Sequence, residues 1–447
     1  MRIGVRVSED EISAVGMLGD GRLLTAGTRS PLGFVAAVAA AIAELRDAGG
    51  ERVSSVVFDV SEVLALDAGA NVTSVFIEPR SPIEPRSHFW AAEDIPVQVE
   101  ALRGGHNALG HELVELSTAE LHRLVERVPT GAQIVVSAAG SPVNAEHEHR
   151  TAAAFRSRST VASVVESSSF SSDSLLSREF TAVVNSLLLT SAELLASGLA
   201  DAVATLSDNS VRAFVTTNDG GCTPLTRLPI TPVHSFRSQP SVSLIGAATL
   251  VGRSEGWIVI ARENGVVIGE LIDGLPAMLN RTDLPGGASL ASSAARVVPL
   301  TEVLLAGSAS PTATVLVPGG ERALAPFGLA PTAVTDEDLV AVGAAVAPMS
   351  YWHHSVTTAQ DAAGMTRALQ HGETVARANL VAAGAEPAAV RIAESRVLST
   401  AYGETHMVRI RVRGVAHTGK PGVDASPLHD DSLTPIAGTV PSLGAGA

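Results

Sequence analysis

The sequence has 447 residues, of which 46% are hydrophobic and only 3% aromatic, and its formal net charge is −15. This length gives room for roughly two or three domains. With so few aromatic residues, the core must be built from Ala, Val, Leu and Ile, which is typical of strands that alternate with small-residue helices. A surface for nucleic acid or an anionic membrane needs clustered basic residues, so the acidic balance argues against both kinds of partner.

The start of the chain and its cysteine content favour a cytoplasmic location. Residues 1–7 read as a strand and are followed by acidic residues, unlike the apolar core of a signal peptide. No window approaches about 18 uninterrupted apolar residues, so we expect no membrane-spanning segment. The single cysteine, Cys222, cannot form an intrachain disulfide, which fits a reducing compartment.

Hydrophobic periodicity predicts strands and helices in alternation along the chain. Residues 1–30 alternate as a hairpin with a turn at Gly19-Asp20-Gly21, and residues 31–48 have helical spacing. Residues 81–100 contain prolines and a tryptophan and are expected to form a loop. The other predicted strands are 54–60, 72–79, 132–138, 161–167, 212–217, 257–261, 266–274, 312–320 and 406–415. The other predicted helices are 117–128, 145–156, 178–206, 245–252, 336–347 and 361–384.

This order of elements predicts an α/β protein with two sheets and covering helices. We expect an N-terminal α/β lobe at 1–210 and a second, shortened α/β lobe at 211–415. The segment 416–447 is rich in Gly, Pro, Ser and Asp and is expected to be a disordered tail.

Several short motifs occur in an order that resembles one known family. They are Ser141-Pro142-Val143-Asn144-Ala145-Glu146-His147-Glu148, Arg178-Glu179 with Thr181 and Asn185, Thr217-Asn218-Asp219-Gly220-Gly221, the segment 232–240 followed by Gly246-Ala247-Ala248, and the segments 376–387 and 408–413. Their residues and their order resemble the hydantoinase A/oxoprolinase family over about residues 1–415.

The resemblance implies two actin-like or sugar-kinase-like lobes, each ribonuclease H-like, with mixed sheets flanked by helices. Relatives open cyclic amides or carboxylate ketones at the expense of ATP with Mg²⁺. They work with a B-type subunit or with paralogous copies, so the resemblance implies a hydantoinase-type partner subunit or a homo-oligomer.

The motifs that bind ATP phosphates in that family are altered in this chain. Residues 6–11 read Arg-Val-Ser-Glu-Asp-Glu where active relatives have D-x-G-G-T-x-T-D, whose glycines let backbone N–H groups reach the phosphates. Residues 260–267 have lost the acid, paired glycines and threonines of the second phosphate loop, and the family's S-G-P step is Ser238-Gln239-Pro240. The segment between Gly287 and Val315 is also shorter than in relatives. We therefore expect no cofactor.

Polar and glycine residues after two predicted strands are the candidate site residues. Asn218 and Asp219, with Gly220 and Gly221, follow the strand 212–217, where ligands of open α/β sheets usually lie. A polar turn is the alternative, because Asn, Asp and Gly favour turns. Gly319-Gly320 resembles a glycine pair that approaches the adenosine in relatives, and a plain turn is again the alternative.

Histidines and the cysteine offer weaker candidates. His106, His111, His147 and His149 would allow a metal site with Glu148, but residues two apart on a helix do not face each other, so we expect no metal. We likewise expect no metal at the pair His353-His354. A nucleophilic role for Cys222 would need a base nearby, and the sequence identifies none.

Two functions follow from these observations. The first is a non-catalytic or regulatory subunit of a hetero-oligomeric complex, which keeps the family fold without ATP chemistry. The alternative is an active hydrolase of cyclic amides, of the hydantoin or 5-oxoproline type, in which Asp219, Asn218 or a histidine carries the chemistry.

Overall fold

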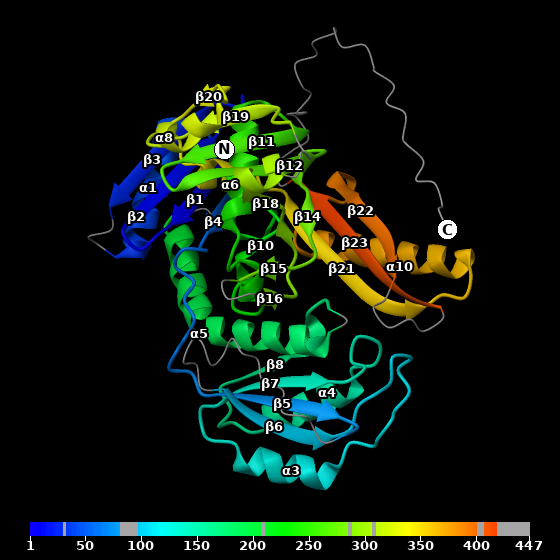
Figure 1. Cartoon of the computed structure of the whole chain (residues 1–447). Coiled ribbons are helices and arrows are strands. Elements are labelled where there is room, and N and C mark those ends of the chain that lie inside the picture. Colours follow the sequence, from blue (N-terminus) through cyan, green and yellow to red (C-terminus); the bar gives the residue numbers. More distant parts are fainter. Residues whose placement is uncertain are drawn as a thin grey trace, which may run out of the picture.

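The computed structural model describes residues 1–29, 33–80, 97–172, 174–206, 211–284, 288–305, 310–399 and 406–417. These residues form an α/β protein with several sheets flanked by helices (Figure 1).

A nine-stranded sheet forms the centre of the molecule, in the order β22-β23-β21-β10-β9-β4-β1-β2-β3. Its strands are β1 (Arg2–Val7), β2 (Glu11–Met17), β3 (Leu23–Arg29), β4 (Ser55–Asp59), β9 (Arg212–Thr216), β10 (Cys222–Pro224), β21 (Met349–Thr358), β22 (Val390–Ser399) and β23 (Met407–Ala416). β1, β4 and β9 run parallel to one another, and β1, β2 and β3 form antiparallel hairpins. Strands from both ends of the chain therefore share one sheet.

Helices cover both faces of the N-terminal part of this sheet. The helix α1 (Phe34–Gly49) packs against β1, β2 and β3, and Gly50 ends it in the left-handed conformation at φ 61°. On the other face, α9 (Leu339–Val346) packs against β1, β2 and β4 and crosses α6 (Gln239–Leu250). The side chains of Ile3 and Val5 are fully buried, which accounts for the apolar alternation of β1.

A four-stranded parallel sheet forms a separate subdomain between β4 and the next long helix in the chain. Its order is β6-β5-β7-β8, from β5 (Val72–Glu78), β6 (Val97–Arg103), β7 (Gln133–Ala138) and β8 (Ser163–Glu166). The helices α3 (Thr118–Arg127) and α4 (Glu146–Arg156) belong to it, and Figure 1 shows it below the rest of the molecule. Short 3₁₀ turns occur at η1 (Ser167–Ser169), η2 (Leu225–Arg227) and η3 (Pro232–His234).

The helix α5 (Leu175–Ala204) joins this subdomain to the central sheet. It is the one described helix that is long and apolar enough to cross a membrane by length and composition. Residues 178–189 are buried on every side, and the part after them buries residues three and four apart, including Leu195 and Leu199, while Glu193 and Asp201 are exposed. This pattern is that of a core helix that covers a sheet.

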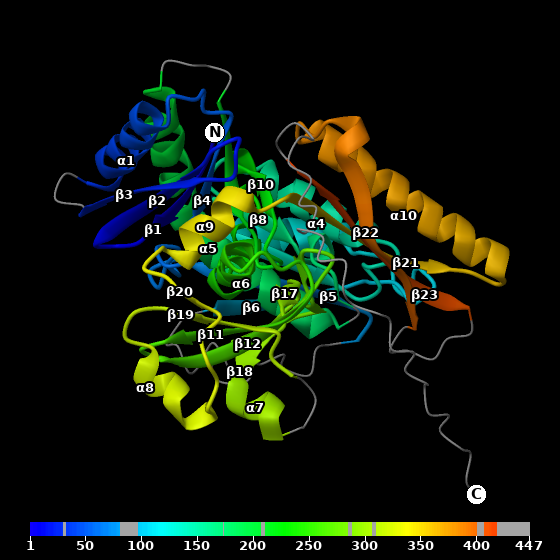
Figure 2. The same ribbon diagram turned by 90° about the horizontal axis from the view of Figure 1, so that it is seen from above.

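A second mixed sheet lies beside the first, in the order β13-β12-β11-β19-β20 with β18 against β12 (Figure 2). Its main strands are β11 (Gly256–Arg262), β12 (Gly265–Ile272), β18 (Val297–Pro299), β19 (Ala313–Leu316) and β20 (Ala333–Val334). The short strands β13 (Leu275–Pro276), β14 (Met278–Leu279), β15 (Thr282–Asp283), β16 (Ser289–Leu290) and β17 (Ala294–Ala295) follow β12, and α7 (Leu300–Leu305), α8 (Glu321–Leu324) and the 3₁₀ turn η4 (Ala325–Phe327) lie near this sheet.

The C-terminal strands β21, β23 and β22 form an antiparallel ribbon that extends the nine-stranded sheet away from the body (Figures 1 and 2). The long helix α10 (Ala362–Ala382) packs along one face of this ribbon and is followed by the 3₁₀ turn η5 (Pro387–Ala389).

Most predicted elements are present, and four predictions need correction. The two predicted sheets are three larger sheets and two two-stranded ones, because among the described strands β5 to β8 pair only with one another. The loop predicted at 81–100 is a strand from Val97 onward, because β6 pairs with β5, and residues 81–96 lie outside the described residues. α6 begins at Gln239, six positions before the predicted start, because Pro240 occupies the first turn, where a proline is tolerated. β23 continues to Ala416, one residue into the predicted tail, and residues 418–447 lie outside the described residues.

The predicted lobe boundary at residue 210 stays a prediction. The nine-stranded sheet takes β1–β4 from one side of this position and β9, β10 and β21–β23 from the other.

Candidate functional site

The predicted site residues Asn218, Asp219, Gly220 and Gly221 form the tight turn between β9 and β10. The N–H of Thr217 donates to the carbonyl of Gly221 at 2.9 Å, and the N–H of Gly220 donates back to Thr217 at 2.8 Å. Gly220 has φ 80°, a conformation that favours glycine. The turn thus lies at the carboxyl end of β9, in the middle of the central sheet.

Asn218 is buried and its polar groups are all bonded within the protein. Its Nδ2 donates to the carbonyl of Val233 and to Ser292 Oγ, both at 3.0 Å. Its Oδ1 accepts from the N–H of Arg237 at 2.9 Å. The side chain therefore ties the β9–β10 turn to the segment around η3 and to the short strands after β12.

The Asp219 carboxylate accepts from five donors. Oδ1 accepts from Thr217 Oγ1 at 2.5 Å and from the N–H of Gly221 at 3.0 Å. Oδ2 accepts from Ser350 Oγ at 2.5 Å and from Trp352 Nε1 at 2.8 Å, and it forms an ion pair with Arg413 Nη2 at 3.0 Å. The side chains of Asp219 and Arg413 are only 4% and 2% exposed.

This environment keeps Asp219 ionised and fully bonded. Burial by itself raises the pKa of the carboxyl group, but the Arg413 charge and the hydrogen bonds outweigh it and lower the pKa to about 2. A general base needs a lone pair that can reach a substrate proton. In this arrangement Asp219 acts as the anionic half of a buried ion pair.

Close packing leaves no room for a side chain at either glycine of this turn. A Cβ on Gly220 would lie 2.7 Å from Ile245 Cδ1, and one on Gly221 would overlap Ser350 Cβ. Their role in binding a cofactor stays a prediction.

Gly319 and Gly320 lie in the other sheet, after β19. Gly319 has φ 87°, and a Cβ on Gly320 would lie 2.5 Å from the carbonyl oxygen of Ala261 at the end of β11. The pair therefore lets the loop pass close to β11. It is not part of the Asp219 cluster, and its adenosine role also stays a prediction.

A row of arginines on β23 completes the surroundings of Asp219, and sequence analysis did not assign it to the site. Arg409, Arg411 and Arg413 are two apart and share one face of the ribbon. The guanidinium of Arg411 lies 4.3 Å from the centre of the Trp352 ring and that of Arg413 lies 5.3 Å from it. The alternation Arg-x-Arg-x-Arg in 409–413 indicates a charged strand face, but it does not indicate that Asp219 is the partner of this face.

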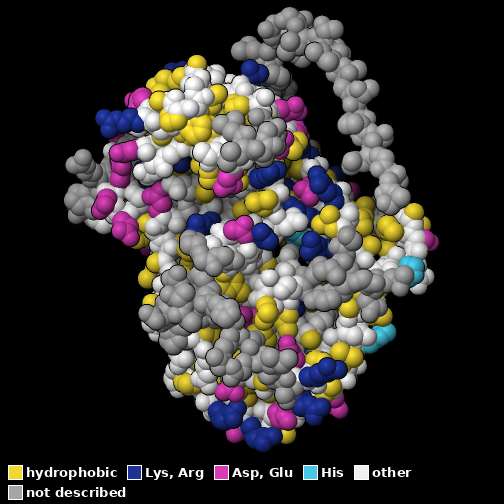
Figure 3. Space-filling model, viewed as in Figure 1, with side chains coloured by type: hydrophobic (Ala, Val, Ile, Leu, Met, Phe, Trp, Pro, Cys, Tyr) yellow, Lys and Arg dark blue, Asp and Glu magenta, His cyan; other side chains and the backbone are white. Residues whose placement is uncertain are grey.

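Two histidines near this cluster are neutral. Burial, followed by the charge of Arg411, lowers the pKa of His354 to about 3. Burial lowers the pKa of His234 to about 4, and its Nδ1 lies 2.9 Å from Ser292 Oγ. In Figure 3, Arg side chains lie in the middle of the molecule above the four-stranded subdomain, with acidic side chains among them.

The hairpin β1–β2 ends in a cluster of charges around Arg6. The Arg6 Nε lies 2.5 Å from Asp338 Oδ2, Nη1 lies 3.1 Å from Glu62 Oε2, and Nη2 lies 3.5 Å from Glu11 Oε2. Burial lowers the pKa of Arg6, but the three carboxylates outweigh it and raise the pKa. Asp338 also caps α9, accepting from the N–H groups of Val340 and Ala341. Through Asp338, Arg6 thus links the β1–β2 hairpin to α9, the helix that follows β20 of the second sheet.

The hairpin β11–β12 ends near the same cluster. Arg262 and Gly265 are paired across a two-residue turn, Glu263-Asn264. Burial lowers the pKa of Arg262, and the charges of Asp338, Arg6 and Glu62 act on it as well. Arg6 and Arg262 therefore bring the ends of both hairpins to one acidic group of side chains.

Other candidates from the sequence have structural partners. Cys222 is buried, and burial raises the pKa of its thiol to about 11, which opposes a thiolate nucleophile. His147 accepts from the N–H of Gly105 at 2.8 Å and lies 2.9 Å from Glu112, while His149 pairs with Glu166. Within the described ranges, no group of three or more His, Cys, Asp or Glu residues is arranged to hold a metal ion.

Comparison with known proteins finds likeness at the level of structure. No protein-family model matches the sequence, and no curated protein matches it. An acetone carboxylase in its nucleotide-free structure, from work on ATP-dependent acetone carboxylation, matches with a TM-score of 0.66 and 10% identity, over 93% of this chain and 87% of that one. The ATP-dependent caprolactamase from Pseudomonas jessenii matches with a TM-score of 0.64 and 12% identity, over 98% of this chain and 90% of that one.

The chain has the fold of these ATP-dependent enzymes. The mixed α/β architecture with helix-flanked sheets is thereby confirmed, while the actin-like arrangement of two lobes stays a prediction. At 10–12% identity the likeness concerns the fold and not the function.

Proposed function

We propose that this chain is a degenerate hydantoinase A/oxoprolinase-like protein that acts as a non-catalytic subunit of a hetero-oligomeric complex and does not use ATP. The observation that carries the proposal is the charge cluster in which Arg6 is bound by Asp338, Glu62 and Glu11.

The Arg6 cluster replaces a phosphate-binding loop with internal ion pairs. Backbone N–H groups on a glycine-rich turn bind phosphates because they point outward and carry positive partial charge. Here the turn has no glycine, and Ser8 Oγ donates to the carbonyl of Glu11 and accepts its N–H. A triphosphate at this place would meet Glu11, Glu62 and Asp338, whose carboxylates would repel it.

The second hairpin supports the same conclusion. Its turn has only two residues between the paired Arg262 and Gly265, which leaves no loop to surround a phosphate. One of the two is Glu263. Its side chain lies against the glycine turn after β19, where a Cβ on Gly319 would be 3.5 Å from Glu263 Cβ. Both hairpin turns therefore carry carboxylates, whose charge has the wrong sign for a phosphate.

The carboxylate and the thiol of the Asp219 cluster are held in internal contacts. Asp219 is saturated with donors, Cys222 is a buried thiol, and His234 is bonded to Ser292. An active cyclic-amide hydrolase would need a free base or nucleophile at this position. This supports the non-catalytic subunit over the hydrolase.

Thermal unfolding with and without Mg-ATP tests the proposal. A ligand at 100 times its dissociation constant stabilises a folded protein by about 2.7 kcal/mol, which would raise the midpoint by several degrees. We expect no rise for this chain with millimolar Mg-ATP, relative to Mg²⁺ alone. The ATP-dependent caprolactamase from Pseudomonas jessenii serves as the positive control.

Equilibrium dialysis with labelled ATP provides a second measurement that does not depend on stability. Saturable binding at one site per chain would overturn the proposal and revive the hydrolase interpretation.

A further inference from the structure

The strand β21 has a free edge over most of its length. On one side it pairs with β23 at all ten of its positions, from Met349 to Thr358. On the other side it pairs with β10 only at Met349, opposite Cys222. Beyond that point no described strand lies against it, and Figures 1 and 2 show the ribbon projecting from the body.

The direction of the backbone groups on this edge follows from two hydrogen bonds. The N–H of Cys222 donates to the carbonyl of Pro348 at 2.8 Å, so Pro348 faces the β10 side. The N–H of Ala359 donates to the carbonyl of His406 at 2.7 Å, so Ala359 faces the β23 side. Because backbone groups alternate along a strand, those of positions 352, 354, 356 and 358 face the free edge beyond β10. None of these backbone groups bonds another residue of the described chain.

This edge lacks the features by which proteins usually prevent strand addition. The opposite edge of the ribbon, β22, has a register irregularity between Ile392 and Glu394 and carries Arg391 and Arg396. β21 keeps a regular register and contains no proline and, unlike β22, no arginine. Long, regular and unpaired edges accept strands from other chains.

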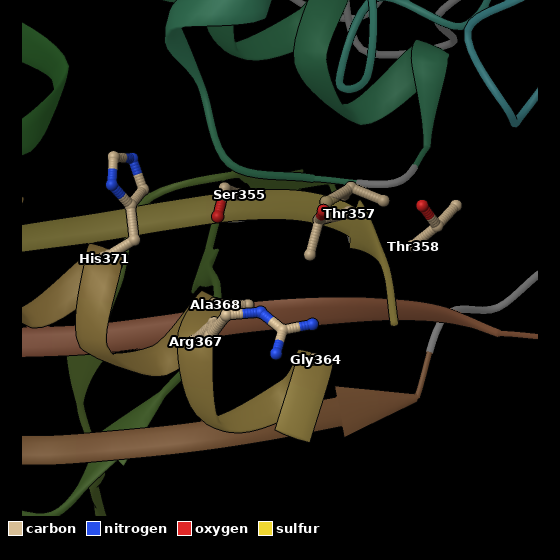
Figure 4. A pocket seen from close by; sticks show the side chains of 8 residues that line it. Ser355, Thr357, Thr358, Gly364, Arg367, Ala368 and His371 are labelled. Carbon is tan, nitrogen blue, oxygen red and sulfur yellow. The ribbon is translucent and has the colours of Figure 1, made fainter. Parts of the chain in front are cut away.

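A groove runs between this edge and the helix α10. It has a volume of about 430 Å³, and four residues of β21 and four of α10 line it: Ser355, Val356, Thr357, Thr358, Gly364, Arg367, Ala368 and His371 (Figure 4). The α10 residues are three and four apart, so they form one face of the helix. An edge strand flanked by a helix is the geometry in which extended peptides add to a sheet.

The groove is basic in a chain whose net charge is −15. Among the described residues that line it, only Arg367 and His371 are charged or titratable, and none carries a carboxylate. On the other face of the ribbon, Arg409 stands opposite Val356 and Arg411 opposite His354, and Arg411 also lies 3.2 Å from Glu394, the one described carboxylate paired with it there. A strand added here would place its side chains alternately toward these two basic faces. Charge therefore selects an acidic strand and opposes a second copy, which would bring Arg367 and His371 of both chains together.

We propose that an extended, acidic segment of a partner protein adds as a strand to the free edge of β21, alongside α10. This builds on the proposed subunit role by naming the surface and chemistry of the partner contact. It involves no nucleotide, so ATP binding and strand addition succeed or fail in separate measurements.

A synthetic peptide as long as β21, which has ten residues, is the first probe. It alternates Glu with Val or Thr, and its matched controls are the same sequence with Lys for Glu and the same sequence with alternate amides N-methylated. We expect the acidic peptide to bind by fluorescence anisotropy, the Lys peptide to bind about tenfold more weakly, and the N-methylated peptide not to bind. In hydrogen exchange, the amides of the even positions 352–358 should become protected.

Variants of the edge test the same contact from the side of the protein. Val356→Pro removes one outward N–H without touching the ladder to β23, and prolines are tolerated on sheet edges. We expect it to weaken peptide binding at least about tenfold, or about 1.4 kcal/mol, with little change in the unfolding midpoint. Val356→Thr, which keeps the N–H, should bind as the native chain does. Arg367→Glu should weaken the acidic peptide, and Arg367→Lys should restore most of the binding.

Three results would overturn the proposal. One is the absence of peptide binding up to millimolar concentration. Another is equal binding of the N-methylated peptide, which would mean that charge alone attracts it. The third is a native dimer in sedimentation that Val356→Pro converts to a monomer, because the edge would then belong to a second copy.

Discussion

The ion pair between Asp219 and Arg413 joins residues that are distant in the sequence. The turn after β9 supplies the carboxylate, β23 supplies the guanidinium, and β21 supplies two further donors, Ser350 and Trp352. Breaking a buried ion pair on one side leaves an uncompensated charge, which is strongly destabilising. The pair therefore fixes the C-terminal ribbon to the centre of the sheet.

We expect Asp219→Asn to lower the free energy of unfolding by about 3 kcal/mol, because Arg413 would stay buried without its counter-charge. Chemical denaturation measures the change. The double variant Asp219→Asn with Arg413→Met should recover part of the loss. If Asp219→Asn alone were neutral, the ion pair would have no structural role.

The same pair gives a pH dependence with a defined sign. The pKa of Asp219 falls from 3.8 to about 2 on folding, so its contribution to stability is present above about pH 4 and is lost as the pH falls toward 2. The difference in unfolding midpoint between the native chain and Asp219→Asn should therefore shrink between about pH 4 and pH 2 and stay constant from about pH 5 to 7. A constant difference down to the lowest pH would contradict the assignment.

Residue patterns predicted the polar turn but not its partners. Asn218 and Asp219 stood out because polar residues and glycines follow a buried strand. Arg413 lies 194 positions later, and only the register of β21 and β23 brings it to Asp219. Hydrophobic periodicity identifies faces of a strand but carries no information on pairing between distant strands.

At the scale of elements, strong periodicity was reliable and mixed composition was not. β1, β7 and α5 have clear apolar patterns and were predicted close to their bounds. β21 was missed because its residues Tyr351, Trp352 and the two histidines mix polar and aromatic types without alternation. β22 was missed because Ala, Glu and Arg in 390–399 have no strand preference.

The crossing of α6 and α9 depends on small residues. A Cβ on Gly343 of α9 would overlap the carbonyl oxygen of Val242 in α6, and one on Gly246 of α6 would overlap the carbonyl of Leu339. The two backbones are therefore in direct contact. Neither helix can rotate past the other without losing it.

We expect Gly343→Ala to cost about 3 kcal/mol or more, since the methyl group meets rigid backbone. Gly27→Ala is the matched control, because a Cβ at Gly27 would have only the carbonyl of Ile12 within 4 Å, at 3.6 Å. Thermal unfolding of both variants compares them. Equal midpoints would mean that the helices can separate at little cost.

At the scale of the whole molecule, α5 attaches the four-stranded subdomain to the rest. Arg178 donates to the carbonyl of Ala138 at 3.2 Å, and Glu179 accepts from Ser74 Oγ at 2.8 Å. Burial raises the pKa of Glu179 to about 7, although the hydrogen bond from Ser74 lowers it. These residues belong to the motifs that resemble the hydantoinase A/oxoprolinase family, and here they serve the packing of the subdomain.

The attachment should weaken as the pH rises. Folding raises the pKa of Glu179 from 4.5 to about 7, so the folded state loses stability between about pH 4.5 and 7 and gains none above. Glu179→Gln should be more stable than the native chain at about pH 8, by on the order of 3 kcal/mol, and equal to it near about pH 4. Unfolding followed at both pH values checks this, and an unchanged difference would contradict it.

The central sheet combines strands that lie far apart in the sequence, and this affects how the chain folds during its synthesis. β10 finds its neighbour β21 only when Met349 has been made, about 130 positions after Cys222. At about 5–20 residues per second, that interval lasts roughly 6–25 s. During this time the edge of β10 has no β21 to pair with. The Asp219 carboxylate lacks its ion-pair partner, because Arg413 has not yet been translated. The growing chain therefore exposes an aggregation-prone surface long after its first strands have folded, and its yield in cells should depend on the chaperones that bind such edges.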